Sequence, residues 1–333
     1  MSFLSEYSLF LAKTTTIVVA IILVLFAILA LKIKAKGEDN GSLQIKKLNK
    51  KYDETTEMMN EIIQSKSEKK AIKAADKRAK KDKKNGSKET PEKKRIFVMH
   101  FDGDIKASAV DDLRETITAI LLTARSDDRV LLCLESGGGM VNGYGLASSQ
   151  LQRLRDANIH LTVAIDKVAA SGGYMMACVA NEIIAAPFAI IGSIGVIAQL
   201  PNFHRLLQKS NIDFEQITAG EYKRTLTVFG KNTSEGREKL QSEVDETHDL
   251  FKSFVKTHRE NVVIEEVATG EHWFAAQCVE KKLIDTLQTS DDFLLSKKAE
   301  FDLYELTFKM KQPLAKRLTH FIHNTMHQLM AAR

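Results

Sequence analysis

The sequence AASGGYMMA occupies residues 169–177 and places one hydroxyl, that of Ser171, among small residues. The apolar run Leu161–Ile165 precedes it and predicts a buried strand, and Tyr174–Val179 predict the first turns of a helix. Glycines directly after the serine allow a substrate backbone to approach closely, and the free N–H groups of a helix N-terminus point outward there. Such a turn suits a nucleophile with an oxyanion site beside it, and it also fits a purely structural turn.

Strand and helix patterns alternate from residue 96 onward, which predicts an α/β fold with a mostly parallel sheet and helices packed around it. The expected strands are 96–101, 130–134, 161–165, 182–186 and 195–200, with a strand-like run at 214–218, and the expected helices are 110–124 and 142–155. In such sheets ligand sites gather at the carboxyl ends of strands.

The strand at 130–134 ends in the sequence ESGGGMV, which contains Gly137, Gly138 and Gly139. This glycine run has neither the G-x-G-x-x-G spacing of a dinucleotide site nor the Gly-Lys-Ser/Thr of a phosphate loop. Glycines here free backbone N–H groups to face a ligand oxygen, although a structural turn would need them as well. Because both follow strand ends, the glycine run and Ser171 are expected to meet in space.

A serine hydroxyl is a poor nucleophile until a base takes its proton. None of the nine histidines lies in a motif that marks a base, and the Ser-x-x-Lys spacing fails because position 174 is tyrosine. A lysine serves as a base when burial lowers its pKa from about 10.4 by several units. Lys223, which follows the run 214–218, is the leading candidate, and spacing leaves Lys167 and Lys209 open as rivals.

Residues Thr14–Leu31 form an uncharged, mostly apolar run of 18 residues, about 27 Å long as a helix, which matches the hydrocarbon thickness of a bilayer. Lysines follow it, in place of the small-residue cleavage site of a signal peptide. We therefore expect a retained single-pass transmembrane anchor in the cell inner membrane. More lysines follow the run than precede it, a charge bias that favours a cytoplasmic catalytic domain.

The segment after the anchor is expected to be a linker. Apolar residues at heptad-like spacing between Ile45 and Ile62 leave open a coiled coil, a helix on the membrane, or a helix on its own domain. Residues Lys66–Arg95 hold fourteen Lys/Arg and five Asp/Glu, a net charge of +9, whereas the whole chain carries +5. The stretch lacks interleaved aromatic residues and any nucleic-acid-binding module, so we expect a solvated tether attracted to anionic membrane lipid and no nucleic-acid partner.

The expected organisation is a tail and anchor at 1–36, a helical and basic linker at 37–95, a catalytic domain at 96–296, and a C-terminal strand and amphipathic helix at 297–333. Three cysteines lie in apolar stretches and are expected to be core residues, without a disulfide framework. They are Cys133, Cys178 and Cys278. His320, His323 and His327 share one face of the C-terminal helix, and a polar face explains them more simply than a metal site.

Four motifs occur in a fixed order: Gly138-Gly139 after a strand, then 170–174 (ASGGY), 192–196 (GSIGV) and 220–223 (GEYK). Together with the anchor, the basic linker and a single catalytic domain, they resemble the short members of the signal peptide peptidase A family of membrane serine proteases. The resemblance covers nearly the whole chain. It implies a ClpP/crotonase-like fold of repeated strand–strand–helix units, and rings or domes in which neighbouring subunits complete the active site.

The same resemblance implies the roles of individual residues. Ser171 would be the nucleophile, Lys223 the general base, and Ser193 a hydrogen-bond partner that holds the lysine amine. The N–H groups of Gly139 and Gly172 would form the oxyanion hole, and Gly138 would shape that loop. The expected enzyme is a Ser-Lys serine peptidase that needs no cofactor or metal and cleaves apolar peptides, such as signal peptide remnants or damaged membrane-proximal proteins.

One position departs from the family pattern, since Gly137 stands where these proteases usually have proline. Glycine in place of proline gives the oxyanion loop more backbone freedom, which would loosen the loop by roughly 1 kcal/mol or less. Two other readings stay open. One is a crotonase-like acyl-thioester enzyme, which leaves Ser171 and Lys223 without roles, and the other is a membrane scaffold with a decayed active site. A Ser-His-Asp peptidase like ClpP is disfavoured because Val196 occupies the position of its histidine.

Overall fold

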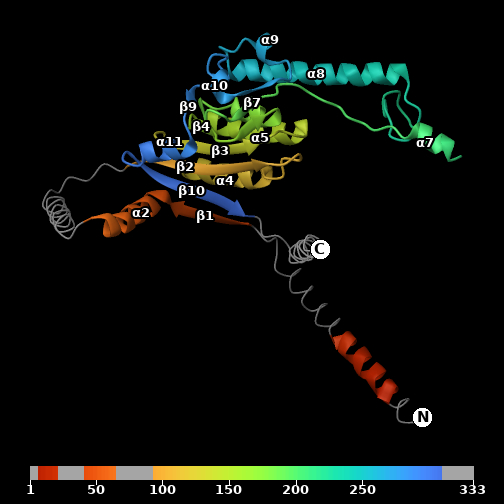
Figure 1. Cartoon of the computed structure of the whole chain (residues 1–333), viewed down its shortest axis with the longest axis horizontal. Coiled ribbons are helices and arrows are strands. Elements are labelled where there is room, and N and C mark those ends of the chain that lie inside the picture. The colour runs from red at the N-terminus through yellow and green to blue at the C-terminus, as the bar shows by residue number, and fades with distance from the viewer. Residues whose placement is uncertain (1–6, 22–40, 65–92, 310–333) are drawn as a thin grey trace. The chain divides into compact units, whose positions relative to one another are not determined.

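The computed structural model describes residues 7–21, 41–64 and 93–309 (Figure 1). Residues 43–308 form one compact unit, and residues 7–21 form a helix of a separate unit. Among the residues described, no helix has both the length and the apolar character needed to span a bilayer. The predicted anchor continues through residues 22–31, which lie outside the described part, as do residues 65–92 of the basic linker and the C-terminal helix with its three histidines.

The compact unit is built on a sheet whose main path runs β1-β10-β2-β3-β4-β6-β9. From β10 to β9 the neighbouring strands pair in parallel. The strands are β1 (Ser42–Lys47), β10 (Phe301–Lys309), β2 (Lys94–Gly103), β3 (Arg129–Ser136), β4 (His160–Ile165), β6 (Glu182–Ala185) and β9 (Thr286–Leu287). The apolar runs of the central strands β2, β3, β4 and β6 are buried on both faces, as the sequence predicts for a parallel sheet, whereas β1 and β9 at the edges are largely exposed. The α/β prediction is confirmed.

Three short strands extend from the end of β3 and carry the site described below: β5 (Val168–Ala170), β7 (Ile190–Gly192) and β8 (His272–Phe274). β5 pairs in parallel with both β3 and β7, and β8 pairs antiparallel with β7. The predicted strands at 195–200 and 214–218 are wrong, because neither segment joins the sheet. Gly192 and Ser193 both have positive φ, 106° and 51°, and this turn directs the chain away from the strands.

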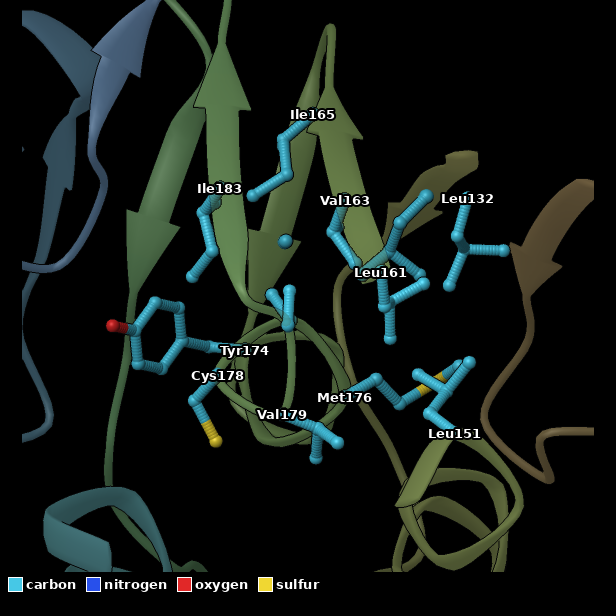
Figure 2. Packing of buried hydrophobic residues seen from close by; sticks show 14 of the residues in the cluster. Leu132, Leu151, Leu161, Val163, Ile165, Tyr174, Met176, Cys178, Val179 and Ile183 are labelled. Carbon is cyan, nitrogen blue, oxygen red and sulfur yellow. The ribbon is translucent and has the colours of Figure 1, made fainter. Parts of the chain in front are cut away.

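Helices α4 (Val110–Thr123), α5 (Val141–Asp156) and α6 (Gly172–Ala177) pack on one face of the sheet. Figure 2 shows α6 beneath β4, with Met176 extending toward Leu151 of α5. Each large apolar side chain that is fully buried here stabilises the fold by about 1.5–3 kcal/mol. Cys178 and Cys278 belong to this core, as predicted, and burial raises the pKa of the Cys278 thiol to about 12.

The opposite face of the sheet is covered by α2 (Leu48–Ile63) and α11 (Ser290–Lys297). Leu48 is buried against this face, and the buried amide of Asn49 donates to the carbonyl oxygen of Phe301 at 2.9 Å and accepts from Leu303 N at 2.7 Å. The start of the stripe, Leu48 and Tyr52, thus packs on the helix's own domain, whereas Met59 and Ile62 near the end of α2 are exposed. The segment expected to be a linker contributes β1 and α2 to the compact unit, and the segment after residue 296 contributes β10.

Two features extend from this body. Helix α8 (Ser234–His258) crosses the α5–α6 side and is followed by α9 (Ile264–Val267) and α10 (Ala275–Cys278). Residues 197–233, which include α7 (His204–Lys209), form a long excursion that we call the arm. Figure 1 shows α7 and its loop standing away from the sheet.

Candidate active site

The register of β3, β5 and β7 brings distant parts of the sequence to one edge. Ser136 at the end of β3 is opposite Ala169, and Ala170 at the end of β5 is opposite Gly192 at the end of β7. Since the three strands are parallel, the residues that follow them emerge side by side. The glycine loop 137–139, Ser171 and Ser193 are therefore neighbours. The meeting of the glycine loop with Ser171 is the one that we predict from the strand ends.

Ser171 lies at the sharp turn between β5 and α6 with φ 53° and ψ −120°, a backbone conformation that serines seldom adopt. The turn is held on both sides, because Ser171 N donates to the Gly192 carbonyl oxygen at 2.8 Å and the Ser171 carbonyl oxygen accepts from Met175 N at 3.0 Å. A strained residue that its surroundings fix in this way is typical of functional sites. Its hydroxyl lies at the N-terminal end of α6, as the sequence predicts.

The glycine loop packs directly against Ser171. Gly138 has φ +89°, and a Cβ placed on it would lie 2.8 Å from Ser171 Cβ and 2.8 Å from Gly172 N. Gly138 N donates to Ser136 Oγ at 3.1 Å, so this N–H is already used. Within the described residues, the N–H groups of Gly139 and Gly172 donate to no backbone or side-chain acceptor. Two main-chain donors therefore remain free beside the hydroxyl.

A cavity of about 20 Å³ adjoins the Ser171 hydroxyl. It lies between the glycine loop, α6, residues 195–196 just before the arm, and α8, and its apolar wall includes Val141, Met175 and Val196. Thr247 and Phe251 of α8 close it. The position that would hold the histidine of a ClpP-like peptidase does face the cavity, but valine occupies it. Among the residues described, no histidine or lysine lines this space.

The three candidate bases lie elsewhere in the chain. Lys223 is exposed on the arm, where it lines an apolar groove with residues such as Phe214 and Leu226. Lys167 pairs with Glu135 at 2.9 Å, and this hydrogen bond raises the pKa of the lysine, which favours the charged form that cannot act as a base. Lys209 is exposed in α7. One copy of the chain thus assembles the serine and the donors but not the amine.

Four residues near the site were not predicted from the sequence: Ser136, Tyr144, Thr247 and Phe251. Tyr144 and Phe251 lie on apolar helix faces and therefore look like ordinary core residues. Thr247 and Phe251 reach the cavity only because α8 folds back over α6. The sole sequence signal was the position of Ser136 next to the glycine loop.

Residues 2–151 match the N-terminal domain of peptidase family S49, and residues 153–303 match the peptidase family S49 domain itself. The chain belongs to peptidase family S49. Among its relatives is a probable protease SohB of Buchnera aphidicola subsp. Schlechtendalia chinensis, 50% identical over 306 residues that cover 89% of this chain and all of the relative. A probable protease SohB of Haemophilus influenzae is 46% identical over 94% of this chain and 91% of its own length.

A solved structure of the 1510-N membrane-bound stomatin-specific protease with a substrate peptide aligns with 70% of this chain and 99% of its own, at a TM-score of 0.45 and 12% identity. The S49 assignment rests on the sequence matches and confirms the family predicted from the four motifs. Both SohB relatives carry the description of a probable protease. The described residues contain no group of three or more acidic, histidine or cysteine side chains that could hold a metal ion.

Proposed function

We propose that this S49 chain is a membrane-anchored serine endopeptidase of ClpP/crotonase-like architecture in which Ser171 is the nucleophile and Lys223 the general base. One observation carries the proposal: Ser171 lies on a strained, tightly held turn beside two free main-chain donors, the N–H groups of Gly139 and Gly172. A structural turn needs no free donors next to a hydroxyl, whereas acyl transfer requires them. Neither the crotonase-like nor the scaffold reading gives this serine a role.

In the proposed reaction the uncharged amine of Lys223 takes the Ser171 hydroxyl proton as Ser171 Oγ forms a bond to the peptide carbonyl carbon. The carbonyl oxygen becomes an oxyanion and accepts hydrogen bonds from Gly139 N and Gly172 N. The lysine then gives its proton to the leaving amine as the peptide C–N bond breaks, and an acyl-enzyme remains. Water, deprotonated by the same lysine, then adds to the acyl carbon. The bond between this carbon and Ser171 Oγ breaks, the lysine returns its proton to Ser171 Oγ, and the second product leaves as a carboxylic acid. Ser193 would hold the lysine amine in position.

The arm supplies Lys223, and we propose that it does so from a neighbouring copy of the chain. Several of its apolar side chains are largely exposed, among them Leu206, Ile217 and Tyr222, with 60%, 96% and 57% of their surface accessible. Exposure of this extent marks an interaction surface. A second copy that covered the arm would bury these side chains and remove the lysine from water, which favours its uncharged form. The protein would then act as a homo-oligomer, as the family resemblance implies.

The cavity beside Ser171 indicates the preferred substrate. A cavity of about 20 Å³ has room for roughly one water molecule or one methyl group, and is too small for an aromatic ring. Its apolar wall favours alanine or another small residue before the cleaved bond. Such residues end many signal peptides, which suits cleavage of signal peptide remnants and other apolar peptides at a membrane. We place the chain in the inner membrane, held by residues 14–31, with the flanking charges favouring a cytoplasmic catalytic domain.

The test uses the full-length protein in its assembled form. A fluorophosphonate probe is expected to label Ser171, and peptides with alanine before the cleaved bond are expected to be cut at least tenfold faster than matched peptides with phenylalanine. Ser171→Ala and Lys223→Ala should each abolish cleavage while the protein stays folded, and Lys167→Ala should leave cleavage within twofold of wild type. Normal turnover by Ser171→Ala would overturn the proposal. If the fluorophosphonate probe labels another residue and not Ser171, the result would favour the crotonase-like enzyme or the membrane scaffold.

A further inference from the structure

The glycine loop after β3 is fastened by a directed chain of hydrogen bonds. Gly138 N donates to Ser136 Oγ at 3.1 Å, Ser136 Oγ lies 2.5 Å from Tyr144 Oη, and the Tyr144 hydroxyl donates to the Asp104 carbonyl oxygen at 2.8 Å. Because the Tyr144 proton goes to Asp104, Ser136 gives its own proton to Tyr144 Oη and accepts from Gly138. Both hydroxyl groups in this series of hydrogen bonds, those of Ser136 and Tyr144, therefore donate one bond and accept another.

Two other contacts surround this chain. Ser136 Oγ also lies 3.4 Å from the Gly103 carbonyl oxygen, at the outer limit of a hydrogen bond, so its shorter contact with Tyr144 is the stronger one. Burial raises the pKa of the Tyr144 phenol, which keeps the hydroxyl protonated at neutral pH. The hydrogen bond from this hydroxyl to the Asp104 carbonyl oxygen requires that proton. The Tyr144 side chain has no exposed surface, so water does not compete for these bonds.

The ring of Tyr144 supports the second donor. A Cβ on Gly172 would collide with the Cβ, Cγ and Cδ2 atoms of Tyr144, which means that the Gly172 backbone rests directly on the ring. A Cβ on Gly173 would likewise lie 2.5 Å from the Ser136 carbonyl oxygen. The first turn of α6 is thus seated on the same two residues that hold the glycine loop.

We propose that Tyr144 is a positioning residue that sets the separation between the two main-chain donors, Gly139 N–H and Gly172 N–H. Its hydroxyl fixes the loop through Ser136, and its ring fixes the start of α6. The inference rests on the proposed function, since it concerns the oxyanion site of the same reaction.

A positioning role predicts a specific kinetic change. The oxyanion exists in the transition state and not in the bound peptide, so misplaced donors lower kcat and leave KM nearly unchanged. Tyr144→Phe keeps the ring under Gly172 and removes only the hydroxyl. Loss of one oxyanion donor costs roughly a hundred- to a thousandfold in kcat, so a misaligned donor should cost about tenfold or more.

The experiment measures kcat and KM for peptide cleavage by full-length, assembled protein, with active sites counted from the extent of fluorophosphonate labelling. Tyr174→Phe is the matched control, because Tyr174 is also fully buried and its hydroxyl makes one hydrogen bond, to the Leu283 carbonyl oxygen at 2.8 Å, away from the loop. We expect Tyr144→Phe to lose at least tenfold in kcat with KM within about twofold, and Tyr174→Phe to keep both constants within about twofold.

A double-mutant cycle locates the effect in the loop. Ser136→Ala breaks the same chain, so Ser136→Ala/Tyr144→Phe should be no slower than the slower single variant by more than about twofold. Gly137 does not have positive φ, and a Cβ there meets nothing within 4 Å, so this position has room for a side chain. Gly137→Pro restricts the loop backbone and should recover part of the lost kcat in Tyr144→Phe.

Three results would overturn the inference: a Tyr144→Phe enzyme with kcat within twofold of wild type, an equal loss in Tyr174→Phe, or a double variant whose losses multiply. In each case wild-type protein still cleaves peptide and Ser171→Ala does not, so the proposed function survives. If wild-type cleavage does not depend on Ser171, both the function and this inference fail together.

Discussion

Replacement of Gly138 by alanine is the most informative perturbation of the site, because the atoms that the new methyl group meets lie in or beside the proposed nucleophile and oxyanion site. This methyl would lie 2.8 Å from each of three atoms: the Ala170 carbonyl oxygen, Gly172 N and Ser171 Cβ. All three are backbone atoms or are fixed by the backbone. None can move aside as the end of a flexible side chain would.

Two costs add at this position. The backbone has φ +89°, and a residue with a side chain loses about 1–2 kcal/mol in such a left-handed conformation. Relief of the overlap with three close atoms costs a further 1–3 kcal/mol or so, the usual range for overpacking. The expected loss is therefore roughly 2–5 kcal/mol of unfolding free energy, and each kcal/mol lowers the melting temperature by about 2–4 °C in a domain of this size.

Thermal unfolding and peptide cleavage, measured on the same preparation, test this reasoning. Gly138→Ala should melt at least about 4 °C below wild type and lose at least tenfold in kcat, because the overlap displaces Gly172 N and Ser171. Gly145→Ala is the matched control on α5, where a Cβ meets nothing within 4 Å and alanine should add roughly 0.5–1 kcal/mol of stability. An unchanged melting temperature and kcat in Gly138→Ala would refute the geometry of the loop.

Two further predictions concern stability. Asp128 is buried and accepts hydrogen bonds from Arg95 and from Arg125 N; despite burial, which alone would raise its pKa, these bonds hold the pKa below its usual range. The charged Asp128 therefore stabilises the fold above about pH 4, and this stabilisation is lost as the pH falls through the lowered pKa. In urea unfolding, Asp128→Asn should lower the free energy of unfolding by about 3 kcal/mol at pH 7 and by progressively less below pH 4. The control Asp127→Asn, in an exposed ion pair, should lower it by under about 1 kcal/mol. Asn49→Ala should lower the free energy of unfolding by about 2–3 kcal/mol, because the buried main-chain groups of Phe301 and Leu303 lose their hydrogen-bond partner. The same variant should be cleaved faster by trypsin within α2, and an unchanged rate of proteolysis would contradict the docking of α2 on the sheet.

The central strands and helices could be predicted because their signals are local. Continuous apolar runs mark β2, β3, β4 and β6, and the 3.6-residue period marks α4. The three-residue strands β5, β7 and β8 are too short to carry any period, although they bring the site together. The packing of α2 on the sheet could not be predicted either, because only Leu48, Asn49 and Tyr52 of this helix face the sheet and the rest of the segment is rich in lysine and glutamate.

The residues of the site likewise differ in whether a local sequence pattern marks them. Ser171 and the glycine loop could be predicted, since glycine and serine at strand ends have few other uses in a parallel sheet. Tyr144 could not, because a tyrosine on the buried face of a helix has the same pattern whether it fills the core or supports a donor. Lys223 could be named as a base but not brought to the serine, since no local pattern records what an arm meets in a neighbouring copy.

The central claim, that one chain supplies the serine and another the lysine, can be tested by co-expression of two inactive variants. Ser171→Ala and Lys223→Ala chains that assemble at random in equal amounts form sites with both groups intact in about one case in four. We predict about a quarter of wild-type cleavage from the mixed assemblies. A control that pairs Lys223→Ala with the doubly substituted chain should show none. If mixed assemblies form and remain inactive while the wild type cleaves, the serine and lysine act within one chain, and the arm does not serve a neighbouring copy.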